Sequence, residues 1–105
     1  MWQLNIYSLG GVDGEVTGSC HIIEYKNKKE NFKYMIDCGL HQGGENPDLK
    51  NRAFKTPFNP NELSCVILTH AHADHCGLLP KLVKEGYTSK IHSIPATRDL
   101  ASIII

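Results

Sequence analysis

The stretch that decides the fold is residues 70–75, which read HAHADH and directly follow an apolar run. Three of the six histidines of the chain, His70, His72 and His75, fall within it together with Asp74. Neutral imidazole and carboxylate oxygen bind zinc well, and a donor set without sulfur also suits iron or manganese. The sequence therefore predicts a divalent-metal site at the end of a strand. The plain alternative is a group of surface histidines near a turn.

These four side chains could close one tetrahedral zinc site or be shared between two ions. A single site is difficult to build because the neighbouring side chains of Asp74 and His75 diverge on a turn. Two ions fit better, with His70 and His72 on one and Asp74 and His75 on the other. Each ion then needs further ligands from elsewhere.

The composition limits the classes of function. The chain has 105 residues, of which 41% are apolar and 21% charged, which is enough for one small domain with a core. Lys plus Arg and Asp plus Glu balance at 11 each, so the composition does not point to a polyanion or a membrane as partner. No signal peptide and no membrane-length apolar run is visible, and we expect a cytoplasmic protein. The four cysteines form no CxxC pair and are expected to be reduced thiols.

The pattern along the chain predicts an α/β fold with the order strands first, then β-α-β-α. Residues 65–69 form a continuous apolar run, which is typical of a strand buried on both faces. Residues 40–60 lack a period and are expected to form a long loop. The other predicted strands are 2–9, 21–25, 32–37 and 90–94, and the predicted helices are 77–85 and 95 to the end.

The HxHxDH pattern of residues 70–75 resembles the signature motif of the metallo-β-lactamase fold. Asp37, in the sequence MIDCG of residues 35–39, is similar to the first motif of that fold, an aspartate at a strand end. In the family this aspartate supports the metal loop through hydrogen bonds. The resemblance implies an αββα-type architecture, of which residues 1–105 would be the N-terminal half.

A narrower resemblance is carried by residues 15–20, EVTGSC, which look like the glycine-rich loop of the β-CASP nucleases. This branch of the fold processes RNA and DNA. Residues 76–80 and 96–100 are also similar to segments of that branch. The resemblance implies that Glu15, Thr17 and Ser19 contact substrate or the groups that support the metal ligands.

The implied activity is hydrolysis of RNA phosphodiester bonds by a water that two divalent metal ions activate, with zinc as the best fit. The resemblance assigns His70 and His72 to the first ion and Asp74 and His75 to the second. It also makes Asp74 catalytic, as the residue that orients the attacking water or accepts its proton. The implied partner is RNA, with DNA as the alternative, and no membrane.

The family needs later histidines, a bridging aspartate and a β-CASP cap domain, none of which is found in these 105 residues. We therefore expect an N-terminal portion of a larger enzyme, inactive by itself. Residues 100–105, LASIII, form an apolar end that favours self-association or docking. Two other readings stay open: a hydrolase of thioesters, lactones or β-lactams, and a non-catalytic metal-binding or interaction fragment.

Overall fold

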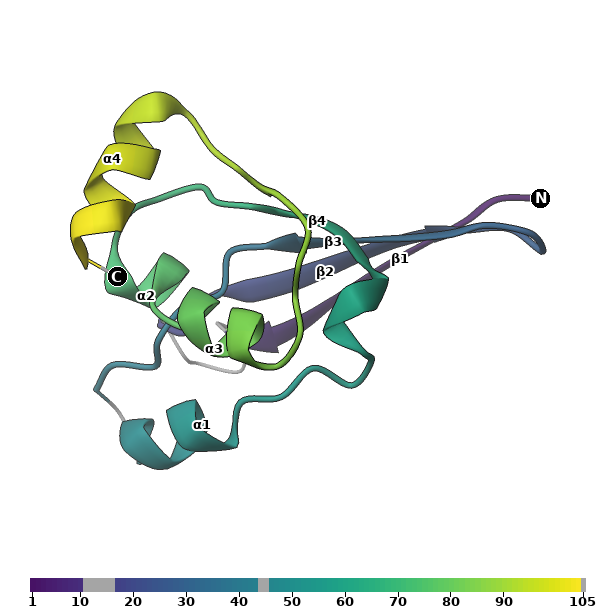
Figure 1. The fold of residues 1–105 in the computed structure, drawn as a ribbon. Helices are drawn as coiled ribbons and strands as arrows, with labels where there is room; N and C mark the ends of the chain where they lie inside the picture. The colour runs from purple at the N-terminus through teal and green to yellow at the C-terminus, as the bar shows by residue number, and fades with distance from the viewer. Residues whose placement is uncertain (11–16, 44–45, 105) are drawn as a thin grey trace.

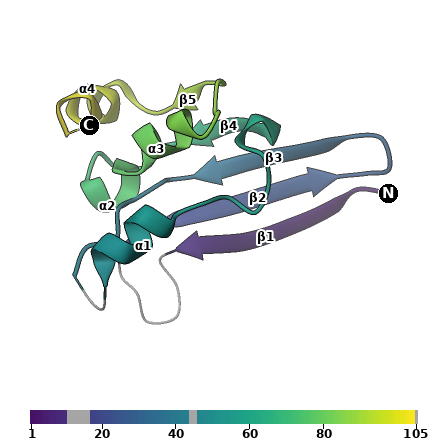
Figure 2. The ribbon, with the colours of Figure 1, turned by 60° about the horizontal axis from the view of Figure 1, so that its bottom comes forward.

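The structure, a computed structural model, describes residues 1–10, 17–43 and 46–104. Its centre is one five-stranded sheet in the order β1-β2-β3-β4-β5, of which Figure 1 labels β1 to β4 and Figure 2 also labels β5. The strands are β1 (Gln3–Gly10), β2 (Cys20–Lys26), β3 (Asn31–Ile36), β4 (Leu63–Ile67) and β5 (Ile91–His92). The helices are α1 (Pro47–Ala53), α2 (Ala73–Cys76), α3 (Leu79–Lys84) and α4 (Pro95–Ile104), and a 3₁₀ turn spans Pro60–Glu62. The predicted α/β class is confirmed.

The sheet is mixed, and its parallel part positions the site. β1, β2 and β3 pair antiparallel, whereas β3, β4 and β5 run parallel (Figure 2). Ile36 at the end of β3 lies opposite Ile67 at the end of β4. The carboxyl ends of these two strands therefore meet at one edge of the sheet, where α/β proteins commonly build their sites.

The core lies between one face of this sheet and the helices that follow β4. Ile22, Met35 and Val66 sit side by side on three neighbouring strands and are fully buried. Leu79 and Leu82 of α3 complete the same cluster of buried side chains. The four cysteines are free, and Cys20, Cys38 and Cys76 act as small buried apolar residues in this core.

The opposite face of the sheet corrects one prediction. Residues 65–69 were expected to be buried on both faces, but β4 spans Leu63–Ile67 and Ile67 is 39% exposed. Val66 points into the core, while Ile67 faces the other side, as strand alternation requires. Trp2 stacks on Tyr25 of β2 on that side, with ring centroids 4.3 Å apart.

Helix α1 lies inside the segment that was expected to be a long loop. None of its residues is buried, so it has no apolar stripe that a period could reveal. Its local signals are those of a helix: Pro47 in the first turn, Asp48 near the start, and Lys50 and Arg52 near the end. The helix is held by Lys81, whose ammonium group donates to two carbonyls at its C-terminal end.

Of the predicted helix 77–85, the structure forms α3, and a further short helix that was not predicted, α2, ends just before that range. Gly77 follows α2 directly, and α3 begins two residues later with Pro80 in its first turn, where proline is tolerated. β5 covers only two residues of the predicted strand 90–94. Among the described residues, no helix has the length and apolar character needed to cross a membrane.

Candidate metal centre

The four predicted metal ligands lie on the connection from β4 into α2. His70 follows the strand, His72 occupies the position just before α2, and Asp74 and His75 lie within α2. The imidazole ring centres of His70 and His75 are 4.7 Å apart, and those of His70 and His72 are 6.1 Å apart. The chain thus gathers three imidazoles at the carboxyl end of β4.

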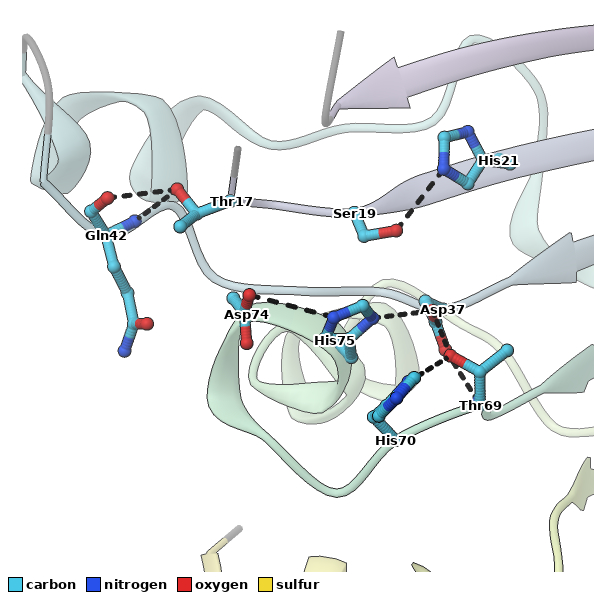
Figure 3. A network of polar contacts seen from close by, with 9 residues as sticks. All are labelled: Thr17, Ser19, His21, Asp37, Gln42, Thr69, His70, Asp74 and His75. Carbon is cyan, nitrogen blue, oxygen red and sulfur yellow. Dashed lines mark hydrogen bonds and ion pairs between the residues drawn. The ribbon is translucent and has the colours of Figure 1, made fainter. Parts of the chain in front are cut away.

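Asp37 is the hub of the polar contacts around this cluster (Figure 3). Asp37 directly follows β3, and its side chain is almost completely buried. Its backbone has a φ of 64°, a conformation that aspartate adopts more readily than most residues. Its Oδ1 accepts a hydrogen bond from the Thr69 backbone N–H at 2.8 Å. Its Oδ2 accepts from the Thr69 hydroxyl at 2.6 Å and lies 2.8 Å from Nδ1 of His75.

The contact between Asp37 and His75 selects one form of the imidazole. An ionised carboxylate only accepts hydrogen bonds, so Nδ1 of His75 must carry the proton that it shares with Oδ2. In the neutral ring Nε2 then presents a lone pair, which is the arrangement of a metal-binding histidine. Nε2 lies 3.7 Å from Oδ2 of Asp74. The two residues assigned to a shared ion therefore face each other.

The donor chemistry of this cluster fits a divalent ion, with imidazole nitrogens and carboxylate oxygens in one place. In residues 1–10, 17–43 and 46–104, no three His, Cys, Asp or Glu side chains are arranged to hold an ion.

The adjacent cysteine, Cys76, belongs to the apolar core of the protein. Cys76 is fully buried, and burial raises the pKa of its thiol, to which the nearby carboxylates of Asp37 and Asp74 add. The hydrogen bond with Cys20, together with burial, raises the pKa of Cys38 in the same direction. Both groups are therefore neutral thiols.

Two other segments fix the backbone of α2. Three consecutive carbonyls of α2 accept hydrogen bonds from outside the helix: Ala73 from Leu40, Asp74 from Ser19 and His75 from Cys38, at 2.8–3.0 Å. Gly39 lies in the same contact, and a Cβ atom there would come within 1.6 Å of the Asp74 carbonyl oxygen. The described end of the EVTGSC segment therefore reaches the HxHxDH segment through its backbone.

The described side chains that were predicted to contact substrate, Thr17 and Ser19, make hydrogen bonds with different partners. Ser19 Oγ contacts His21 Nε2 at 3.3 Å, and the Thr17 hydroxyl exchanges hydrogen bonds with the Gln42 backbone (Figure 3). Glu15 lies outside the described residues. Sequence reasoning missed Thr69, whose signal is its place directly before the first histidine of the motif.

Comparison with known proteins identifies the family to which this chain is similar. Residues 13–100 match the model of the metallo-beta-lactamase superfamily. Ribonuclease TTHA0252 of Thermus thermophilus is 40% identical over 95 residues, which are 90% of this chain and 20% of the ribonuclease. Transcription termination factor FttA of Methanosarcina mazei is 34% identical over 96% of this chain and 15% of its own length.

Cleavage and polyadenylation specificity factor subunit 3-II of Arabidopsis thaliana is 31% identical over 90% of this chain and 16% of its own length. The chain thus spans a fifth or less of these relatives. Their names are those of a ribonuclease, a transcription termination factor and a cleavage and polyadenylation factor, in agreement with the resemblance to the β-CASP branch. The match over residues 13–100 confirms the resemblance of the HxHxDH motif, and the chain belongs to the metallo-beta-lactamase superfamily.

Proposed function

We propose that this chain is the metal-binding part of a β-CASP-type ribonuclease that hydrolyses phosphodiester bonds in RNA. One observation carries the proposal: the backbone N–H of Ser19 binds the carbonyl of Asp74, at 3.0 Å. This contact joins the loop that resembles nucleases to the motif that resembles a metal site. The ribonuclease and the cleavage factor among the relatives support the same class of substrate.

In this proposal His70 and His72 hold one divalent ion, and Asp74 and His75 hold the second, with zinc as the best fit to the donor set. When bound, two such ions supply Lewis acidity for the activation of water and for the charge on phosphate. The chain's own residues do the remaining work. Asp37 keeps the Nδ1 proton of His75 in place, and the Asp74 carboxylate orients the attacking water or accepts its proton.

Hydrolysis belongs to the complete protein in this proposal, because the matched stretch is a fifth or less of the relatives. Further ligands and the surface that binds RNA come from outside residues 1–105, and these residues alone are inactive. We place the protein in the cytoplasm, with RNA as its partner and no contact with a membrane.

The direct test replaces Asp74 by alanine in the full-length protein and measures cleavage of end-labelled RNA with and without a chelator. Wild-type protein should cleave in a metal-dependent manner, and Asp74→Ala should abolish cleavage. Asp48→Ala changes an exposed aspartate of α1 and serves as the matched control, with activity unchanged. Cleavage by Asp74→Ala at the wild-type rate would overturn the assignment, and turnover of a thioester or a cephalosporin instead of RNA would favour a small-molecule hydrolase.

A further inference from the structure

We propose that Thr69 is a positioning residue of the candidate metal centre, whose hydroxyl determines which nitrogen of His70 is free to bind an ion. The expected effect of Thr69 on metal binding rests on the proposed function, whereas the hydrogen bonds that it makes are observed in the structure without metal. Nothing in the resemblance of residues 70–75 to known motifs includes this threonine.

The geometry around Thr69 is a short chain of hydrogen bonds (Figure 3). The hydroxyl oxygen lies 2.6 Å from Oδ2 of Asp37 and 3.0 Å from Nδ1 of His70. The backbone N–H of the same residue donates to Oδ1 of Asp37 at 2.8 Å. Thr69 therefore donates two hydrogen bonds to one buried carboxylate.

The number of protons decides the direction of each bond. A hydroxyl has one proton, and the carboxylate of Asp37 can only accept, so the Thr69 proton points to Oδ2. The same oxygen can then only accept from His70, which must carry its proton on Nδ1. Nε2 of the neutral His70 ring consequently keeps its lone pair.

Asp37 thus sets two histidines in the same form, one directly and one through Thr69. His75 donates its Nδ1 proton to Oδ2 itself, and His70 donates its Nδ1 proton to the hydroxyl that Oδ2 holds. Both rings present Nε2, although His70 is exposed at the surface. In water a histidine side chain favours the proton on Nε2, so the exposed ring needs this relay to stay in the binding form.

The test compares Thr69→Val, which has the same shape without the hydroxyl, with Thr69→Ser, which restores it. Valine keeps the backbone bond to Asp37, so the variant removes only the relay. Thr56→Val is the control for the substitution itself, because it removes the hydroxyl of another threonine, which is buried and donates to the Phe58 backbone carbonyl outside the cluster.

Two measurements are made on full-length protein. The first is the ¹⁵N shift of the His70 ring nitrogens in metal-free protein at about pH 8.5, well above the ordinary histidine pKa of about 6.5. The second is the dissociation constant for zinc alone, by competition with a chelator.

We expect the proton on Nδ1 in the wild type, in Thr69→Ser and in Thr56→Val, and a shift of the proton toward Nε2 in Thr69→Val. We expect zinc to bind about 10- to 100-fold more weakly to Thr69→Val, the usual cost of losing a residue that orients a ligand, with serine restoring the affinity. An unchanged His70 tautomer, or unchanged zinc affinity, in Thr69→Val would overturn the proposal. Wild-type protein with the predicted tautomers but without zinc binding would refute the proposed function while leaving the Thr69 relay standing.

Discussion

Replacement of Asp37 by asparagine tests the polar network with the least disturbance of shape. Asparagine has the size of aspartate and also tolerates the positive φ of 64° at this position. Its carbonyl oxygen can still accept from the Thr69 backbone N–H, as Oδ1 does. Its NH₂ group replaces Oδ2, however, and cannot accept from the Thr69 hydroxyl or from His75.

The magnitude follows from these two bonds. Hydrogen bonds to a charged group contribute about 1.5–3 kcal/mol each, and neutral ones about 0.5–1.5 kcal/mol. The exposed Thr69 hydroxyl can turn to water, and His75 can accept from the new NH₂ group through Nδ1 if its proton moves to Nε2. We therefore expect a loss of about 1–3 kcal/mol in the free energy of unfolding. The moved proton occupies the nitrogen that would bind metal, so zinc affinity should fall at least about 10- to 100-fold.

The assay is denaturant unfolding of metal-free protein, followed by zinc competition with a chelator. Asp99→Asn makes the same chemical change at an exposed carboxylate on α4 and should alter stability by less than about 0.5 kcal/mol. If Asp37→Asn unfolded at the same denaturant concentration as Asp99→Asn and bound zinc with wild-type affinity, the reasoning that Asp37 orients the cluster would be refuted.

Three further predictions concern packing and association. Gly39→Ala places a Cβ atom 1.6 Å from the Asp74 carbonyl oxygen and should destabilise the protein by about 1–3 kcal/mol or more in thermal unfolding; an unchanged midpoint would contradict this contact. Leu82→Ala truncates a side chain that is 1% exposed and should lower the free energy of unfolding by about 2–5 kcal/mol. Val83→Ala, at a neighbouring residue that is 53% exposed, should lower it far less, and equal losses would contradict the assignment of Leu82 to the core. Residues 1–105 should self-associate through α4, because its Ile103 is 80% exposed. Ile103→Glu should therefore lower the sedimentation coefficient at high protein concentration. Identical sedimentation profiles for the two proteins would exclude α4 as the surface of association.

The three antiparallel strands were found from their short apolar and β-branched runs, although they differ in burial. β2 and β3 place Ile22 and Met35 in the core, whereas Leu4 and Ile6 of β1 are 62% and 68% exposed. The HxHxDH motif is recognisable from its density of metal-ligating residues alone. Helix α1 was missed because it buries none of its residues and leaves only cap signals. The predicted burial of both faces of β4 was wrong because a continuous apolar run does not reveal whether a second layer covers it.

The contacts of the candidate site depend on pairing that the sequence does not display. Asp37 and Thr69 are 32 positions apart, and they meet because β3 and β4 are parallel neighbours with Ile36 opposite Ile67. Once that pairing is known, a residue just after each strand must lie at the same edge. The direction of the hydrogen bonds then follows from proton counting.

The most direct test of the metal centre is the zinc content of purified full-length protein, measured by elemental analysis for the wild type and for His72→Ala. We expect about two tightly held ions in the wild type, as in two-metal hydrolases, and the loss of at least one in His72→Ala. Equal metal content in the two proteins, or none in the wild type, would contradict the claim that residues 70–75 form a metal centre.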